Sequence, residues 1–249
     1  MGSLQNYAAV IEYDGTGFKG FQAQPGDLRT VQGEITGALT VLADDFCDFS
    51  YAGRTDAGVH AKKQVISFKT ARELDFHRFR WKLNCLLPED IVVKEIKKVG
   101  LDFNARRDAV LREYSYYVVN NYYQSVFFKR FSIMVTAKLD LELMREAAKK
   151  FTGVKDFGAF CNNNLDTGSN VREVYNLKIR KFREGLLVFK IAANSFLYNM
   201  VRIIVGTLLE AGKHERDLES IDAAFETGSR HNAGKIVPSR GLVLTNVIY

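Results

Sequence analysis

The sequence lacks the features that would tie it to a membrane or to an oxidising compartment. It has no run of about 18 uncharged apolar residues, so no membrane-spanning helix is expected. Residues 1–6 contain neither a basic segment nor an apolar one, and no signal peptide is predicted. The cysteines, Cys47, Cys85 and Cys161, are odd in number and widely spaced, and they fit neither a disulfide framework nor a zinc pattern. We therefore expect a cytoplasmic protein with reduced cysteines.

The motifs that usually hold cofactors and metals are also missing. There is no Gly-Lys-Ser/Thr phosphate loop, no Gly-x-Gly-x-x-Gly after a strand and no His-Glu-x-x-His. The four histidines are scattered and do not form a metal-binding set; they are His60, His77, His214 and His231. If the chain is an enzyme, we expect it to work without a cofactor or a metal, through an acid, a phenol and an arginine.

What the sequence does contain is an uneven distribution of charge. Residues 1–103 carry 13 Lys and Arg against 14 Asp and Glu, whereas residues 104–249 carry 22 against 15. The positive excess therefore lies entirely in the second part of the chain. Such an asymmetry indicates a nucleic-acid-binding surface, although a solvated basic surface without a partner has the same composition.

Hydrophobic periodicity and turn signals predict an α+β fold. Strands are expected at residues 7–13, 46–51, 64–68, 91–99, 109–120, 171–182, 186–193 and 242–248. Helices are expected at residues 31–43, 76–87, 141–151, 196–211 and 215–225. The order of these strands and helices is that of a split βαβ, ferredoxin-like unit, and it occurs twice along the chain. We predict two domains, residues 1–103 and 104–249, whose sheets join into one broad antiparallel sheet with fewer exposed edges.

The most informative stretch is the loop at residues 52–61, Ala-Gly-Arg-Thr-Asp-Ala-Gly-Val-His-Ala. It presents one carboxylate, Asp56, between two glycines, with Arg54 shortly before it and His60 shortly after it. Glycines let a backbone turn sharply and let a ligand come close. Asp beside Gly is also ordinary turn chemistry. The loop is therefore either a surface turn or an active-site loop with Asp56 as nucleophile or base.

A second informative residue is Arg202, the only formal charge in the apolar stretch 196–209. Burying a cation without a partner is costly, so a carboxylate partner is expected, and Asp56 is a candidate. Asn199 lies one turn before Arg202 on the same side of the expected helix. The alternatives are that Arg202 reaches solvent along the helix or pairs with another acid.

Tyr114 shares one face of its expected strand with Arg112 and Tyr116. Aromatic side chains on strands mostly pack in a core. A tyrosine beside an acid can also stack on a flipped base and relay protons through its hydroxyl. Both interpretations stay open for Tyr114.

Two loops carry side chains that suit an RNA ligand. Residues 15–29 interleave aromatic rings, amides and a cation, and we expect exposed Phe21 and Gln22 to contact a ring-bearing ligand, unless the phenylalanines pack inward. Residues 229–240 form a basic loop in which Lys235 and Arg240 suit phosphate contacts, with a solvated basic loop as the alternative.

Together these residues resemble the tRNA pseudouridine synthase A family, and the similarity runs nearly end to end. It is carried by residues 13–25 (Tyr-Asp-Gly-Thr-Gly-Phe-Lys-Gly-Phe-Gln-Ala-Gln-Pro), 29–32, 52–61, 103–106, 112–116 (Arg-Glu-Tyr-Ser-Tyr), 156–160, 194–206 and 241–244. The resemblance implies the two-lobed pseudouridine synthase fold, a homodimer, no cofactor and no metal. It implies as substrate the uridines at positions 38, 39 and 40 in the anticodon arm of tRNA.

The resemblance also implies residue roles. Asp56 is implied to be the essential acid, Tyr114 to line the base pocket and Arg202 to pair with Asp56. Arg54 is implied to help extrude the target nucleotide and fill the gap, and Arg106 to belong to the substrate-binding set. The role of His60 stays open.

The reaction that this family carries out fits these residue types. It breaks the C1′–N1 bond of uridine, rotates the uracil and forms a C1′–C5 bond, and the nucleotide must first leave its stack. Asp56 would have to be ionised, either to attack C1′ or to take the 2′ proton, and the sequence leaves both routes open. Two alternatives also remain, namely an RNA-binding module without chemistry and a synthase acting on another RNA.

Overall fold

The computed structural model describes residues 3–162 and 168–249 and divides the chain into two compact units. The first unit comprises Met1–Arg112 with Leu244–Tyr249, and the second comprises Glu113–Val243. The division that we predicted after residue 103 differs from this one. The chain leaves the first unit after Arg112, and the C-terminal residues return to it.

A ten-stranded sheet in a mixed α+β fold confirms the predicted fold class. The strand order is β4-β1-β3-β10-β5-β9-β8-β7, with β2 on β3 and β6 on β5. The strands are β1 (Gln5–Tyr13), β2 (Cys47–Tyr51), β3 (His60–Thr70), β4 (Ile91–Val99), β5 (Leu111–Val119), β6 (Ile133–Met134), β7 (Gly153–Asp156), β8 (Val171–Lys181), β9 (Leu186–Ala193) and β10 (Leu242–Ile248). Among the described pairings, β1–β3, β1–β4, β7–β8 and β8–β9 are antiparallel, whereas β5–β6 is parallel.

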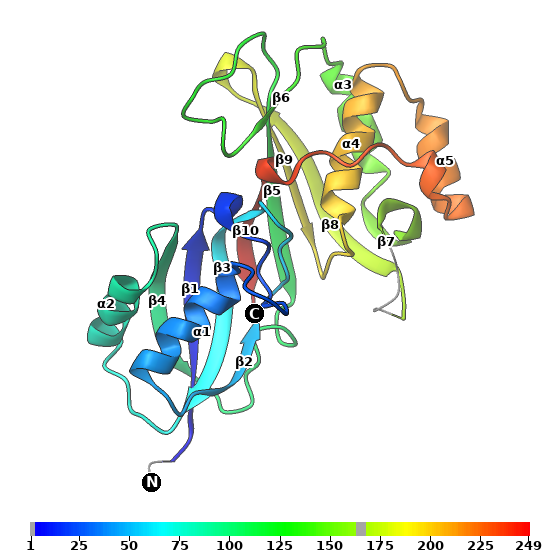
Figure 1. The fold of residues 1–249 in the computed structure, drawn as a ribbon. Helices are drawn as coiled ribbons and strands as arrows, with labels where there is room; N and C mark the ends of the chain where they lie inside the picture. The colour runs from blue at the N-terminus through cyan, green and yellow to red at the C-terminus, as the bar shows by residue number, and fades with distance from the viewer. Residues whose placement is uncertain (1–2, 163–167) are drawn as a thin grey trace. The chain divides into compact units, whose positions relative to one another are not determined.

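In the first unit, helices α1 (Val31–Leu42) and α2 (Phe76–Leu86) pack beside each other, and α2 packs on β4 (Figure 1). Each helix begins at a polar cap, because a side-chain oxygen can satisfy an amide that has no partner inside the helix. Thr30 accepts from the Gly33 amide at 3.2 Å, and Asp75 accepts from the Arg78 amide at 3.1 Å. The central strands β1 and β3 are buried over most of their length and form the core beneath the helices.

In the second unit, α3 (Leu141–Lys149) packs against α4 (Met200–Gly212) and against β8, and α5 (Leu218–Thr227) follows α4 (Figure 1). Asp140 caps α3 by accepting from the amides of Glu142 and Leu143. Eleven of the 13 residues of α4 are buried, as expected for a helix that is apolar on all sides. This central helix carries Arg202.

Three details of the second unit differ from the prediction. Helix α4 begins at Met200 rather than at residue 196, because Asn199 has a left-handed backbone with φ of 60° and cannot continue a right-handed helix. Strands β6 and β7 were not predicted, so this unit does not simply repeat the order of the first. Helix α5 begins three residues later than expected, where Asp217 caps it by accepting from the Ser220 amide.

Across the described ranges, 3–162 and 168–249, no helix is long and apolar enough to cross a membrane.

Candidate active site

The loop that presents Asp56 joins β2 to β3 and is packed closely against the segment that follows β1. Gly20 has φ of +103°, and a Cβ added there would lie 3.1 Å from the Thr55 carbonyl oxygen and 3.6 Å from the carbonyl carbon of Asp56. The Phe21 amide donates to that same Thr55 oxygen at 2.9 Å. Because no side chain fits between the two backbones, the glycine allows one loop to hold the other.

Side chains from β1 and β3 fix the residue immediately before Asp56. The buried hydroxyls of Tyr13 and Thr55 lie 2.7 Å apart. Burial raises the pKa of Tyr13 well above its usual value, so its hydroxyl keeps its proton for this hydrogen bond. Gln64, which is fully buried, donates to the Gly53 carbonyl oxygen at 2.7 Å. Asp56 itself is half-buried at the surface of this framework.

Arg112 holds the start of the loop. Its Nε and Nη2 donate to the Ala52 carbonyl oxygen at 3.1 and 2.9 Å, and Nη1 and Nη2 donate to the carbonyl oxygens of Ala109 and Arg106, both at 2.6 Å. The planar guanidinium can serve several carbonyls at once, which a lysine cannot do. Arg112 therefore ties the Asp56 loop to the segment that enters β5.

His60 closes the other end of the loop, which gives a place to a residue that the sequence left without a role. Its buried Nδ1 lies 3.0 Å from the Gly15 amide nitrogen and 3.0 Å from Asp14 Oδ1. One ring nitrogen cannot accept from the amide and donate to the carboxylate at once. The buried Gly15 amide needs an acceptor and finds it in Nδ1, beside which the Asp14 carboxylate also lies. His60 is thus a structural clamp between the two loops.

If the chain has the activity on RNA that the family resemblance implies, we expect Tyr13→Phe to lower its turnover about tenfold and to leave the KM for RNA nearly unchanged. The ring stays in place, but Thr55 loses its partner and the adjacent Asp56 is no longer held in one position, and small misplacements of reacting groups cost much of the rate. Steady-state kinetics of the purified variant measure this. Tyr7→Phe is the matched control, because it removes a β1 hydroxyl that bonds to Gln5 and Arg72 rather than to the loop. Equal losses in both variants would mean that the effect is general destabilisation.

The side chains that were predicted to bind substrate near Asp56 differ in how far they are exposed to solvent. Arg54 is exposed, and its Nε donates to the Tyr51 hydroxyl at 3.4 Å. Gln22 is half-buried. The expectation that the rings of residues 15–29 are exposed is wrong, because Phe21 has no exposed surface and packs on Tyr51 with ring centroids 4.5 Å apart. Phe21 therefore supports this region from inside, and a direct contact with substrate is not open to its ring.

Arg202 lies in the first turn of α4, where a cation is unfavourable because the helix dipole is positive at that end. Its Nε donates to the Val237 carbonyl oxygen at 2.8 Å, and its Nη1 donates to Asn199 Oδ1 at 2.6 Å. Asn199 thus lies beside Arg202, as its place one turn earlier in the sequence indicated, although it precedes the helix. Asp56 belongs to the first unit and Arg202 to the second, and their pairing stays a prediction.

Tyr114 is 7% exposed and packs edge to face on Phe196, with ring centroids 5.1 Å apart. The neighbouring Tyr116 donates to the Pro238 carbonyl oxygen at 2.7 Å. Burial raises the pKa of Tyr116, although the charges of Arg202 and Arg240 oppose that rise. Packing is therefore evident for both tyrosines, and the role of Tyr114 in the base pocket stays a prediction.

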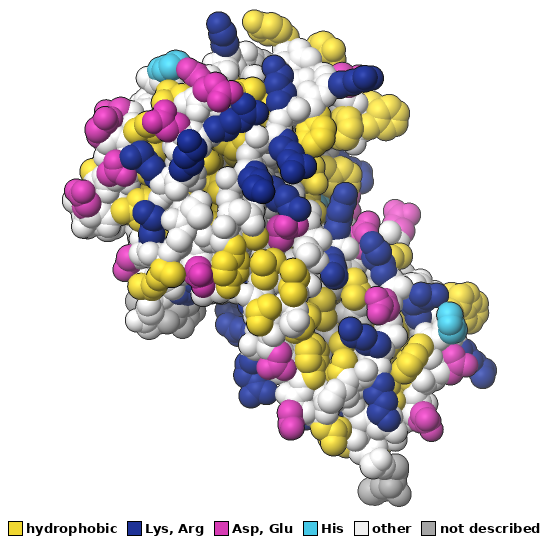
Figure 2. All heavy atoms as spheres, turned by 180° about the vertical axis from the view of Figure 1, so that it is seen from behind, with side chains coloured by type: hydrophobic (Ala, Val, Ile, Leu, Met, Phe, Trp, Pro, Cys, Tyr) yellow, Lys and Arg dark blue, Asp and Glu magenta, His cyan; other side chains and the backbone are white. Residues whose placement is uncertain are grey.

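The basic loop at residues 229–240 borders a polar hollow of about 490 Å³ in the second unit. The charged side chains around it are Glu210, Glu215, Arg216, Arg230, His231 and Lys235. Glu210 neutralises Arg216 at 3.0 Å, while Lys235 and Arg240 are exposed. Arg106 is exposed in the first unit. Figure 2 shows many further Lys and Arg side chains on one face of the second unit, in agreement with the positive excess of residues 104–249.

Among the described residues, no group of three or more His, Cys, Asp or Glu is arranged to hold a metal ion.

Comparisons with known proteins agree with this arrangement of motifs. A family model described as "tRNA pseudouridine synthase" matches residues 9–108 and 147–249. A protein of Bacillus pumilus named tRNA pseudouridine synthase A is 43% identical, over 96% of this chain and 97% of its own length. The protein of that name from Bacillus subtilis is 41% identical over 96% of this chain and 97% of its own. Among solved structures, an H/ACA ribonucleoprotein bound to a substrate RNA is similar over 95% of this chain and 59% of the chain in that structure. The sequence identity is 10% and the TM-score is 0.37, which is too low to support an argument. The match to the family model and the identity over nearly the full chain place this chain in the tRNA pseudouridine synthase family.

Proposed function

We propose that the protein converts uridine to pseudouridine in the anticodon stem-loop of tRNA, at positions 38, 39 and 40, with Asp56 as the catalytic carboxylate. Membership of the family makes the chain an isomerase that acts on tRNA. The observation that carries the assignment of Asp56 is the framework around its loop. Tyr13, Gln64 and Arg112 hold Thr55, Gly53 and Ala52, the residues that lead into one half-buried acid.

Such a framework suits a group that must meet a reacting carbon in one geometry. Asp56 acts as an ionised carboxylate, by attacking C1′ or by taking the 2′ proton. Either route needs the oxygen to stay close to the ribose while the uracil is released and rotated, because holding reacting groups in place removes much of the entropic cost. A surface turn without a function would not require buried polar side chains to hold residues 52, 53 and 55.

We assign Arg202 as the charge partner of Asp56 and Tyr114 as a wall of the base pocket. The position of Arg202 supports its assignment. A cation placed against the positive end of a helix is stabilised by an anionic neighbour, and a carboxylate there also interacts favourably with the helix dipole. Residues that violate a local structural preference, such as a cation in the first turn of a helix, are expected mainly at functional sites. Tyr114 presents a ring whose edge-to-face packing on Phe196 fixes its plane.

The test of the reaction is release of tritium from unmodified tRNA labelled at C5 of uridine. Formation of the C1′–C5 bond displaces the hydrogen on C5, so one tritium is released to water for each pseudouridine formed. We expect release with the purified protein alone, and sequencing of the modified sites should place them in the anticodon stem-loop. Absence of release would overturn the proposed function, and modification confined to another RNA would overturn the proposed substrate.

The exposed cations of the basic loop should contribute to RNA affinity rather than to turnover. Lys235→Ala and Arg240→Ala should each weaken tRNA binding and reduce the slope of log affinity against log salt by about one, because each neutralises about one phosphate. Lys94→Ala is the matched control, since the Lys94 ammonium already pairs with Glu12 at 2.9 Å in the first unit. A salt slope equal to that of the wild type would remove this loop from the RNA surface.

Two further properties belong to the proposal. The protein acts as a homodimer in the cytoplasm, as its family resemblance suggests. The cysteines support a reducing location, because Cys47, Cys85 and Cys161 are all free thiols, the first two of them exposed.

A further inference from the structure

The second unit displays an exposed aromatic surface that the proposed chemistry does not use. It consists of the segment at residues 121–134, between β5 and β6 and including β6, and the hairpin tip at residues 182–184, between β8 and β9. Six of its aromatic side chains are exposed: Tyr122, Tyr123, Phe127, Phe128, Phe131 and Phe182. Tyr122 and Phe127 are 88% and 85% exposed. A concentration of large apolar side chains of this kind on a protein surface marks a binding site.

The backbone that carries these rings is held in place, so their exposure is not a consequence of a poorly packed segment. The Gln124 side chain donates to Ser132 Oγ at 3.0 Å, and Ser132 Oγ donates to the Phe128 carbonyl oxygen at 2.7 Å. The hairpin tip is tied to the same segment, because the Asn121 side-chain amide donates to the Glu184 carbonyl oxygen at 3.4 Å, next to the bond from the Asn120 amide to the Gly185 carbonyl oxygen at 2.9 Å. The backbone from which the rings project is therefore held in one arrangement, which lowers part of the entropy cost of binding.

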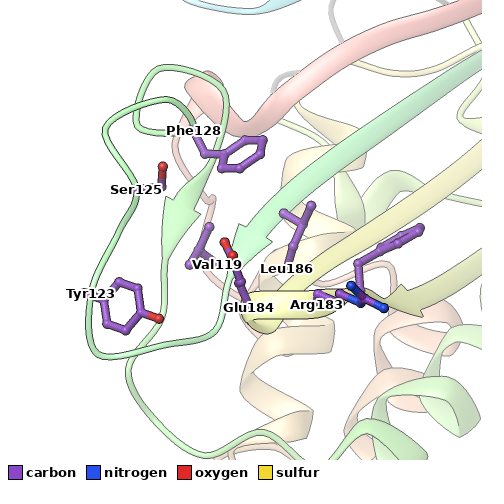
Figure 3. Close-up of a pocket in the computed structure, with 8 residues that line it drawn as sticks. Val119, Tyr123, Ser125, Phe128, Arg183, Glu184 and Leu186 are labelled. Atoms are coloured by element: carbon purple, nitrogen blue, oxygen red, sulfur yellow. The ribbon is translucent and has the colours of Figure 1, made fainter.

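Segment and hairpin tip enclose a largely apolar hollow of about 400 Å³. Figure 3 shows Tyr123, Ser125 and Phe128 on the side of the segment, and Arg183, Glu184 and Leu186 on the side of the hairpin. The hollow falls within the range of volumes that hold small planar ligands, about 300–1,000 Å³.

Cations surround the rings. Exposed Lys129, Arg130, Lys181 and Arg183 lie within or beside the aromatic surface, against one exposed acid, Glu184. Aromatic rings interleaved with cations are the combination by which proteins bind unpaired nucleotides, with bases stacked on the rings and phosphates beside the cations. A second copy of this chain suits the surface less well, because a two-fold interface would bring the same cations together.

We propose that the aromatic surface binds unpaired nucleotides of the RNA substrate, stacking bases on exposed rings such as those of Tyr122 and Phe127. The proposal rests on the proposed function in so far as that function supplies an RNA ligand with a loop. It adds to that function a contact with bases that are not being modified. Such a contact would help to select RNA with unpaired nucleotides over a continuous duplex.

The test is binding of fluorescently labelled, unmodified tRNA to the variant Tyr122→Ala/Phe127→Ala. We expect the dissociation constant to rise at least about tenfold, because each stacked base contributes substantially to affinity. Turnover at saturating tRNA should stay within about twofold of the wild type, since neither ring belongs to the proposed catalytic set. The variant Tyr122→Phe/Phe127→Tyr keeps both rings and should bind like the wild type, whereas Tyr122→Leu/Phe127→Leu keeps apolar area without rings and should bind like the alanine variant.

Trp81→Ala serves as the control for loss of an exposed aromatic side chain, because Trp81 is 67% exposed on α2 in the first unit. Sedimentation velocity is measured on every variant. An unchanged dissociation constant in the alanine variant would overturn the proposal, and so would an altered oligomeric state, which would assign the surface to contact between copies. If the wild-type protein binds tRNA but releases no tritium, the proposed function is overturned. The proposal for the aromatic surface is then still decided by the dissociation constants of the variants.

Discussion

Replacing Asp56 with asparagine is expected to lower tritium release at least about a thousandfold, with tRNA affinity within about threefold of the wild type. Asparagine has nearly the same shape, so the loop framework of Tyr13, Gln64 and Arg112 should stay intact. It cannot carry the negative charge that attack on C1′ or removal of the 2′ proton requires. Losses of this order follow removal of the group that carries out the chemical step in other enzymes.

Two measurements make the result specific to Asp56. Single-turnover kinetics with excess enzyme separate the chemical step from product release, and thermal unfolding shows whether the variant is folded. Asp27→Asn, in the exposed part of the preceding loop, is the matched control. Turnover by Asp56→Asn within tenfold of the wild type would exclude Asp56 as the catalytic acid.

Arg202→Ala is expected to reduce turnover about a hundredfold and to change the KM for tRNA much less. Removing one preorganised donor from an active site commonly costs a factor of about 10²–10³. The acid limb of the pH–rate profile should also move to higher pH. A carboxylate that loses a cationic neighbour holds its proton more tightly, so a larger part of the enzyme is protonated and inactive at a given acidic pH.

The shift of the pH profile separates a charge partner from a residue that only supports the fold. Arg202 also bonds to Val237 and Asn199, and loss of these bonds alone would reduce the amount of folded protein without moving the acid limb. Arg202→Lys keeps the charge and should therefore recover part of the turnover and most of the wild-type profile. Arg145→Ala is the control within the same unit, because Arg145 pairs with Glu142 on α3. An unmoved acid limb in Arg202→Ala would contradict the pairing.

Most elements of the fold could be predicted because their signals are local. Thr30, Asp75 and Asp140 cap the helices that follow them, as short polar residues before an apolar periodic stretch indicate. The start of α4 could not be predicted in this way. The side chains of residues 196 and 197 continue the apolar pattern, and only the left-handed backbone of Asn199 ends it. Strand β7 has four residues, too few for a periodic pattern to be evident.

In the candidate site, too, some features could be predicted from the sequence and others could not. Asp56, Arg202 and Tyr114 stand out in the sequence through unusual neighbours or a family motif. Tyr13, His60 and Arg112 also lie in family motifs, but their role in holding the Asp56 loop could not be predicted, because their partners lie far away in the sequence. Arg112 reaches Ala52 across 60 positions, and His60 reaches Gly15 across 45. Any residue type offers a carbonyl, so no pattern identifies the acceptor.

The return of the chain to the first unit at Leu244 has a consequence for synthesis of the protein. Strand β10 pairs with β3, and the residues around it are tied to the first unit by Lys63, which donates to Asn246 at 2.7 Å, and by Tyr249, which donates to the Ala105 carbonyl oxygen at 2.9 Å. All of the second unit is translated before these contacts can form. The Asp56-bearing unit therefore cannot be completed during synthesis of its own N-terminal residues, and β3 lacks its β10 partner until the last residues of the chain are made.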